Sequence, residues 1–231
     1  MDRYKYILIL SLFLLTILPF AGCTARQQTD IAVEEFPICV DGARQESPAV
    51  SGNIVVWVDE RNGDSDIYGY NMATMTEFLV NVASGEQRAP RVSGDIIVWQ
   101  DRRNGEWDIY GYDMVTMTEF PVCTREGAQV APRVSGNLIL WLDGRNEKLA
   151  VYGYDLTTGQ EFPVVIPAHP PGQPFELSGK VMVWSYQGGV YGYNLESRTE
   201  FPIATGSYKD FVSVGGDTVV WLDSSPTSPL W

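Results

Sequence analysis

Short apolar runs alternate with turn residues along most of the chain, and the alternation repeats. One unit reads Ile-Val-Val-Trp, Arg-Asn-Gly, Asp-Ile-Tyr-Gly-Tyr and Thr-Glu-Phe, and the second unit matches the first at 24 of 42 positions. The units begin in steps of 42, 42, 42 and 39 residues at a shared phenylalanine, at Phe36, Phe78, Phe120, Phe162 and Phe201. A period of this length, built from short β-runs, predicts a β-propeller with one blade per unit.

Each unit predicts four strands. In the second unit, Pro90 fits an innermost strand and Pro121 an outer edge strand, because proline cannot donate to a strand ladder. Asn104-Gly105 separates two apolar runs and is a strong hairpin signal. The expected strands are Gln87 to Ser93, Ile96 to Gln100, Asp108 to Asp113 and Thr118 to Val122.

The fold class is therefore all-β, a propeller of about five four-stranded blades. Phe211 to Asp223 offers two strands of a last blade, and the N-terminal run Glu35 to Cys39 offers an outer strand. We expect this last blade to be shared between the two ends of the chain. Ser224 to Trp231 must supply its third strand or leave it absent. An open array, or a fragment of a longer propeller, is the alternative.

One tryptophan recurs in the second strand of every unit. Its place within an apolar strand predicts packing between blades, although a stack of sugar-binding platforms is the alternative. These residues are Trp57, Trp99, Trp141, Trp184 and Trp221. Trp107 differs, since it follows the Asn-Gly turn where other units have Ser65 and Leu149. We therefore take Trp107 as a candidate ligand contact.

The N-terminus has the pattern of a targeting segment. Arg3 and Lys5 precede an apolar run, Ile7 to Phe20, that is shorter than the roughly 20 residues a transmembrane helix needs. The run ends in Phe20-Ala21-Gly22-Cys23, which resembles a lipoprotein signal and implies lipidation of Cys23. An ordinary secretory signal or an uncleaved anchor is the alternative. Each places the rest of the chain outside the cytoplasm, at the outer face of the membrane or in the cell envelope.

The expected domain organisation is a signal peptide over residues 1–22, a polar tether over 23–34 and a propeller domain over 35–231. The formal net charge is −13, with no basic patch interleaved with aromatic residues. A surface of this charge repels nucleic acid, so nucleic-acid binding is excluded.

Cysteine and histidine chemistry is sparse. Cys39 and Cys123 hold equivalent positions in blades that are not neighbours, so we expect no disulfide between them. His169 is the single histidine and lies in a proline-rich loop. A zinc site or a histidine-based triad is therefore not expected.

The motif Asp-x-Arg-Asn-Gly-x-x-Asp-Ile-Tyr-Gly-Tyr resembles the TolB-like propeller repeats of secreted proteins, especially archaeal surface proteins. It spans Asp59 to Tyr70 and Asp101 to Tyr112, more loosely Asp143 to Tyr154, and shrinks to Val190 to Tyr193. The resemblance covers about residues 35 to 223. It implies a propeller that makes protein contacts at the cell envelope. TolB itself has six blades and a further N-terminal domain, so its own role does not carry over.

The first Asn-Gly loop is acidic. Asp59, Asp64 and Asp66 are weak candidates for calcium ligands, because calcium prefers six to eight oxygens. Their spacing departs from the EF-hand pattern. The alternative is a hairpin in which Asp59 and Asp66 pair with Arg61. We otherwise expect no cofactor.

A glycosidase would need carboxylates gathered at the central channel. Only Glu176 and Asp210 are acidic on the inner strands, on adjacent blades, and we take both as candidate ligand contacts. One interpretation is that they form an acidic pair, and the other is that Arg91 and Arg133 neutralise them. The chain is therefore expected not to be an enzyme, and a glycoside-active enzyme is the less favoured alternative.

Two binding functions remain. The first is a non-enzymatic surface scaffold that binds a protein partner through propeller loops or a propeller face. The alternative is a lectin-like module that binds cell-surface polysaccharide in shallow sites between blades. Four tyrosines recur in the third strands and fit either reading; they are Tyr70, Tyr112, Tyr154 and Tyr193.

Overall fold

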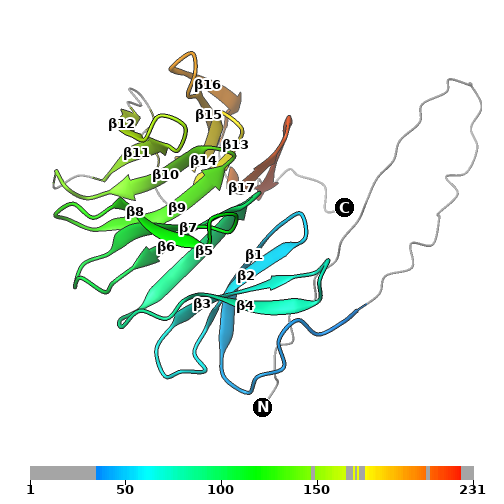
Figure 1. The fold of residues 1–231 in the computed structure, drawn as a ribbon. Coiled ribbons are helices and arrows are strands. Elements are labelled where there is room, and N and C mark those ends of the chain that lie inside the picture. Colours follow the sequence, from blue (N-terminus) through cyan, green and yellow to red (C-terminus); the bar gives the residue numbers. More distant parts are fainter. Residues whose placement is uncertain are drawn as a thin grey trace, which may run out of the picture. The chain divides into compact units, whose positions relative to one another are not determined.

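The computed structural model describes residues 35–146, 149–164, 169, 171, 175–206 and 209–224 (Figure 1). The expected signal peptide over 1–22, the tether over 23–34 with Cys23, and the tail over 225–231 lie outside the described residues. The chain divides into two compact units, Met1–Asp41 and Gly42–Trp231, and every described strand belongs to the second unit. No helix in the described part of the chain is long and apolar enough to cross a membrane.

In the described part of the chain, eighteen antiparallel strands form five sheets, and each sheet corresponds to one blade. The first sheet holds β1 (Gln45–Ser51), β2 (Ile54–Asp59), β3 (Asp66–Asn71) and β4 (Thr76–Asn81). The second holds β5 (Gln87–Ser93), β6 (Ile96–Asp101), β7 (Asp108–Asp113) and β8 (Thr118–Cys123). The third holds β9 (Gln129–Ser135), β10 (Leu138–Asp143), β11 (Ala150–Asp155) and β12 (Gln160–Val164). The fourth holds β13 (Phe175–Ser178), β14 (Val181–Tyr186), β15 (Gly189–Asn194) and β16 (Thr199–Ala204), and the fifth holds β17 (Lys209–Gly215) and β18 (Thr218–Asp223).

Successive blades stack through their first strands. β1 contacts β5, β5 contacts β9, β9 contacts β13 and β13 contacts β17, so these strands run around a common axis (Figure 1). A hydrogen bond joins each pair of neighbours where the first strand ends. The hydroxyl oxygens of Ser51, Ser93, Ser135 and Ser178 accept from the backbone N–H groups of Gly94, Gly136, Gly179 and Gly216 over 2.8–3.2 Å.

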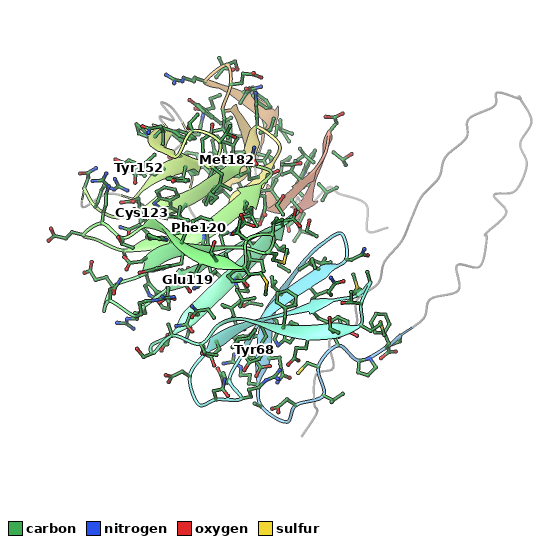
Figure 2. The ribbon with its side chains drawn as sticks, in the orientation of Figure 1. Tyr68, Glu119, Phe120, Cys123, Tyr152 and Met182 are labelled. Carbon is green, nitrogen blue, oxygen red and sulfur yellow. The ribbon has the colours of Figure 1, made fainter. Side chains whose placement is uncertain are left out.

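The core lies between blades, where side chains of facing sheets interdigitate (Figure 2). Val56 and Val58 of the first blade pack with Ile97 and Trp99 of the second. Burying side chains of this size contributes about 2–3 kcal/mol each. The predicted packing between blades is confirmed for Trp99, Trp141 and Trp184, which are fully buried in clusters shared with the preceding blade. Trp57 of the first blade is also buried, at 4% exposed.

A glycine in the third strand of each complete blade is required by close packing. A Cβ built on Gly153 would lie 2.5 Å from Cζ of Phe162 and 2.8 Å from Cδ2 of Leu140. The phenylalanine ring of the outer strand covers the glycine in the neighbouring strand. This contact explains the repeated Tyr-Gly-Tyr and Glu-Phe motifs.

The fold is the predicted all-β propeller, but the last blade differs from the expectation. The expected strand Glu35 to Cys39 is not a strand, and the fifth sheet contains only β17 and β18 among the described residues. Trp221 on β18 is 37% exposed, unlike its four counterparts. In the complete blades a third strand lays a tyrosine against this tryptophan, and the described part of the fifth blade has no such strand.

Candidate functional site

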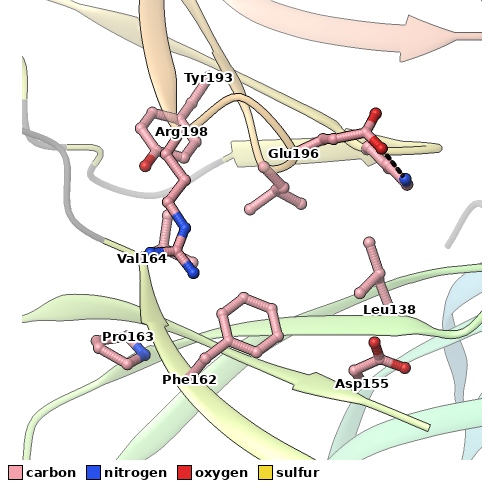
Figure 3. A pocket seen from close by; sticks show the side chains of 10 residues that line it. Leu138, Asp155, Phe162, Pro163, Val164, Tyr193, Glu196 and Arg198 are labelled. Atoms are coloured by element: carbon pink, nitrogen blue, oxygen red, sulfur yellow. Dashed lines mark hydrogen bonds and ion pairs between the residues drawn. The ribbon is translucent and has the colours of Figure 1, made fainter. Parts of the chain in front are cut away.

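A groove of about 620 Å³ opens between the third and fourth blades (Figure 3). Its volume lies within the range of ordinary ligand sites. Side chains from β10, β11, β12, β15 and the adjoining turns surround it. We call it the 3–4 groove, and its lining residues are Leu138, Asp155, Phe162, Pro163, Val164, Lys180, Tyr193, Leu195, Glu196 and Arg198.

The groove has an apolar floor and a charged rim. Phe162 and Leu195 are partly buried against the core between the two blades. Lys180 and Glu196 form an ion pair of 2.7 Å at the rim, where their side chains are 57% and 70% exposed. Figure 3 shows Arg198 reaching across the opening from the turn between β15 and β16. Such a surface can take an extended chain that carries both apolar and charged groups.

The four recurrent tyrosines mark equivalent blade gaps but are largely covered. Tyr193 lines the 3–4 groove and is 4% exposed, and Tyr70 is 8% exposed with its hydroxyl 3.6 Å from the sulfur of Met75. Tyr112 packs on the core between the first and second blades. Tyr154 lines a second, shallower depression beside Pro121 and Glu161. The rings therefore act mainly in packing, which weakens the lectin-like alternative.

Trp107 does not join either groove. It is half-buried in the loop between β6 and β7, with the Arg102 guanidinium carbon 5.8 Å from its ring centroid. Its carbonyl accepts a hydrogen bond of 2.6 Å from the backbone N–H of Gln129. These contacts tie the loop to the third blade.

The acidic loop of the first blade forms a network of hydrogen bonds. Asp59 is fully buried and accepts hydrogen bonds from the Trp57 indole at 2.9 Å and from Arg61 at 2.7 Å. Arg61 also reaches Glu77 at 2.7 Å and lies 4.1 Å above the Tyr68 ring. We call this arrangement of Trp, Asp, Arg, Tyr and Glu the blade network.

The expected pairing is correct for Asp59 and wrong for Asp66. Asp66 faces Asp59 across the ladder and accepts a hydrogen bond of 2.8 Å from Asn62 rather than from Arg61. Asp64 lies in the exposed turn. Within the described ranges, no group of three or more histidine, cysteine or acidic residues is placed to hold a metal ion.

The two aspartates titrate in opposite directions. Burial by itself would raise the pKa of Asp59, but hydrogen bonds from Arg61 and Trp57 outweigh it and lower that pKa. Burial raises the pKa of Asp66, because the amide of Asn62 offsets only part of the lost hydration. Asp143 behaves like Asp59, and Asp108 like Asp66.

The blade network recurs in the second and third blades. Arg103 joins Asp101 and Glu119, each at 2.6 Å, and lies 4.1 Å above Tyr110. Arg145 joins Asp143 and Glu161, each at 2.6 Å, and lies 4.0 Å above Tyr152. Figure 2 labels Tyr68, Glu119 and Tyr152 of these networks.

The fourth blade replaces the arginine with His169. The His169 ring stacks on Tyr191 with centroids 3.9 Å apart, and its Nδ1 meets the Glu200 carboxylate. The Trp184 indole donates to the His169 carbonyl at 2.9 Å. Tyr186 stands where the other blades have the aspartate and contacts the His169 ring edge-on.

A second charged cluster lies on the inner strands. Arg133 of β9 binds Glu176 of β13 through Nε at 3.1 Å and Nη2 at 3.0 Å. Asp210 instead accepts a hydrogen bond of 3.3 Å from the Ser185 hydroxyl. Glu176 is thus paired with an arginine, as one reading of the sequence expected, and the structure does not bring it together with Asp210.

The cysteines lie in different settings. Cys123 is buried at the end of β8, with the Arg145 guanidinium 3.2 Å from its sulfur, and burial raises its pKa to about 11. Cys39 lies outside any strand, and neither cysteine forms a disulfide. A thiol with this pKa is protonated at neutral pH and is a poor nucleophile.

Sequence reasoning missed the 3–4 groove and the role of His169. The groove residues come from turns that differ between repeats, such as Lys180 and Arg198, and repeat matching gave them no weight. A signal for His169 was present. The fourth repeat lacks the Arg-Asn pair that the first three repeats share, and the proline-rich segment before it holds the single histidine.

No protein-family model matches the chain, and no curated protein sequence matches it. Its fold is similar to that of TolB from Acinetobacter baumannii, with a TM-score of 0.53 and 19% identity over 76% of this chain and 46% of TolB. A chain of a nidogen/laminin complex gives a TM-score of 0.57 and 13% identity over 83% of this chain and 76% of that one. Puromycin hydrolase gives a TM-score of 0.58 and 16% identity over 75% of this chain and 30% of the hydrolase.

The chain therefore has a TolB-like β-propeller fold, as its repeats predicted. It spans about half the length of TolB and about a third of puromycin hydrolase, at 46% and 30%. At identities this low, the likeness establishes the fold and leaves activity open.

Proposed function

We propose that this propeller is a non-enzymatic binding scaffold outside the cytoplasm that takes a segment of a protein partner in the 3–4 groove. The observation that carries the proposal is the composition of the groove. An apolar floor at Phe162 and Leu195 lies beneath a rim that holds both signs of charge. Peptide segments present this combination of groups. The groove volume of about 620 Å³ is large enough to hold several side chains.

Two further points support a scaffold. Glu176 is neutralised by Arg133, so it is poorly suited to serve as a catalytic acid or base. Among solved structures of similar fold is a nidogen/laminin complex, an assembly of proteins. The hydrolase among the similar structures shares only 30% of its length with this chain. A location at the cell envelope follows from the N-terminal targeting pattern, and anchoring through Cys23 remains part of the proposal.

The test is a binding screen with the purified full chain against a peptide array and a glycan array. We expect saturable binding to peptides and about tenfold weaker binding after Arg198→Glu, which reverses a charge at the rim. The matched control is Met117→Glu, at the equivalent turn position of the second blade, where the backbone φ is also 57°. This control should bind peptides like the unaltered chain.

Binding to glycans alone would replace the proposal with the carbohydrate-binding alternative. Equal losses in the two variants would show that the peptide does not occupy the 3–4 groove. Turnover of a peptide or glycan during the screen would contradict the non-enzymatic part.

A further inference from the structure

Three charged side chains hold the same position in successive inner strands. Arg91, Arg133 and Glu176 are each the third residue from the end of their strand, on β5, β9 and β13. In β5 the ladder is broken by a bulge between Arg88 and Arg91, and Ala89 within it has a φ of 52°. Bulges re-aim the side chains that follow them. The same kind of bulge precedes Arg133, where Ala131 has a φ of 56°.

These side chains lie at matching positions along the succession of first strands. β5 packs on β9 and β9 packs on β13, and Arg133 and Glu176 meet through hydrogen bonds of 3.1 and 3.0 Å. Arg91, at the matching position of β5, lies close enough to both for their charges to act on its pKa. We call Arg91, Arg133 and Glu176 the axial cluster.

The two arginines are held alike but are partnered differently. Nη1 of Arg91 donates to the Pro90 carbonyl at 2.8 Å, and Nη1 of Arg133 donates to the Pro132 carbonyl at 2.9 Å. Arg133 uses its Nε and Nη2 to grip Glu176. Among the described residues, no carboxylate lies within 4.0 Å of the Arg91 guanidinium.

Arg91 is therefore an oriented cation that lacks a carboxylate of its own. It is half-buried, and burial together with the nearby Arg133 charge lowers its pKa to about 10, so it stays charged at neutral pH. Two cations and one anion leave the axial cluster with a surplus positive charge. The surplus stands out in a chain whose formal net charge is −13.

We propose that Arg91 binds the carboxylate of a ligand at the axis of the propeller, beside the Arg133–Glu176 pair. We infer a carboxylate ligand because the equivalent arginine, Arg133, already binds the carboxylate of Glu176 through two hydrogen bonds. A planar guanidinium fork matches a carboxylate in this way. The site uses none of the residues of the 3–4 groove, so it stands or falls separately from the proposed function.

The test is calorimetric titration of the full chain at low ionic strength with succinate and with a blocked acidic peptide, Gly-Asp-Gly. These two probes distinguish a free small acid from a carboxylate on a peptide. Succinamide is the neutral control, and sulfate and phosphate are the competing anions. We expect saturable binding of at least one carboxylate, none of succinamide, and weaker binding of the other anions.

Arg91→Gln should lower the affinity at least about tenfold, because a charge-assisted two-point contact is lost. The matched control is Arg88→Gln on the same strand, whose side chain is 48% exposed and pairs with Glu86. It should leave the affinity unchanged. Glu176→Gln should strengthen binding, since it releases Arg133 as a second grip.

The proposal is overturned if the folded chain binds no carboxylate, if Arg91→Gln binds as well as the unaltered chain, or if sulfate and phosphate bind equally well. Should Arg91→Gln fail to fold, Arg91→Lys keeps the charge and removes the fork. That variant should also bind about tenfold more weakly.

Discussion

The first three blades and the fourth place different side chains between the tyrosine of the third strand and the glutamate of the outer strand. In each of the first three, an arginine from the hairpin next to the tryptophan joins a buried aspartate, a tyrosine ring and a glutamate. In the fourth, that hairpin has shortened to Gln187-Gly188, and His169 arrives from the preceding loop. The tyrosine and the glutamate are present in both arrangements: Tyr191 and Glu200 of the fourth blade correspond to Tyr68 and Glu77 of the first.

The difference shows which part of the network is needed. The ring and the glutamate are common to all four blades, whereas the aspartate is present only where the arginine is. In the fourth blade Tyr186 takes the place of the aspartate, so no buried carboxylate needs a cation there. We infer that the arginine chiefly compensates the buried aspartate, and that the histidine chiefly completes the packing on Tyr191.

Arg145→Ala tests the role of the arginine directly, and we expect it to cause the largest loss of unfolding free energy. It leaves the Asp143 carboxylate, which is 1% exposed, without its main counter-charge. Removing one partner of a buried ion pair costs about 3–5 kcal/mol of unfolding free energy. Urea unfolding followed by tryptophan fluorescence measures it. Arg125→Ala is the control, because Arg125 meets the same Glu161 with a side chain that is 64% exposed, and it should cost less than about 1 kcal/mol.

Gly153→Ala compares packing in the third and fourth blades. The new Cβ would meet Phe162 and the fully buried Leu140, so we expect a loss of about 1–3 kcal/mol in unfolding free energy. For Gly192→Ala, the three atoms nearest the new Cβ all belong to the ring of Phe201, which is 37% exposed and able to move. The fourth-blade variant should therefore lose less in the same urea experiment. Equal losses would mean that the outer strands hold their rings equally firmly.

His169→Ala tests whether the histidine does less than the arginine. The change removes a stacked ring from Tyr191 and a partner from Glu200 but exposes no buried aspartate. We expect a loss of about 1 kcal/mol in unfolding free energy. A loss as large as that of Arg145→Ala would contradict the division of roles inferred above.

Acid titration gives the smallest and most specific effect. The pKa of Asp143 is lowered in the folded state, so its stabilising contribution is complete above the unfolded value of about 3.9 and is lost as pH falls through the lower folded value. Thermal unfolding between pH 6 and 2.5 should show Asp143→Asn less stable than the unaltered chain, with the gap narrowing toward low pH. Asp66→Asn is the control of opposite sign, because burial raises the pKa of Asp66 and its charge opposes folding near neutral pH. A gap for Asp143→Asn that stays constant with pH would contradict the assigned direction.

Much of the fold was predictable because it depends on patterns of residues that are close together in the sequence. Turn residues, short apolar runs and a fixed repeat period predicted the bounds of the strands to within a residue or two. The strand Asp108–Asp113 is an example. Trp99, Trp141 and Trp184 were correctly placed between blades. The candidate site was less predictable. Of the tyrosines chosen for their recurrence, Tyr70 and Tyr193 are buried and Tyr112 and Tyr154 are half-buried. Recurrence in a repeat protein reports mainly on the contact that every repeat must make.

The sequence by itself determined the class of fold, the strands of the four repeated blades and the tryptophans that fill the gaps between those blades, because each depends on neighbours close along the chain. Tertiary structure decided the rest. It gave His169 the place of an arginine from a different loop, formed the 3–4 groove from strands and turns of two blades, and joined Arg133 of the third blade to Glu176 of the fourth. These groupings join residues tens of positions apart, so they depend on how the sheets stack around the axis rather than on any local preference.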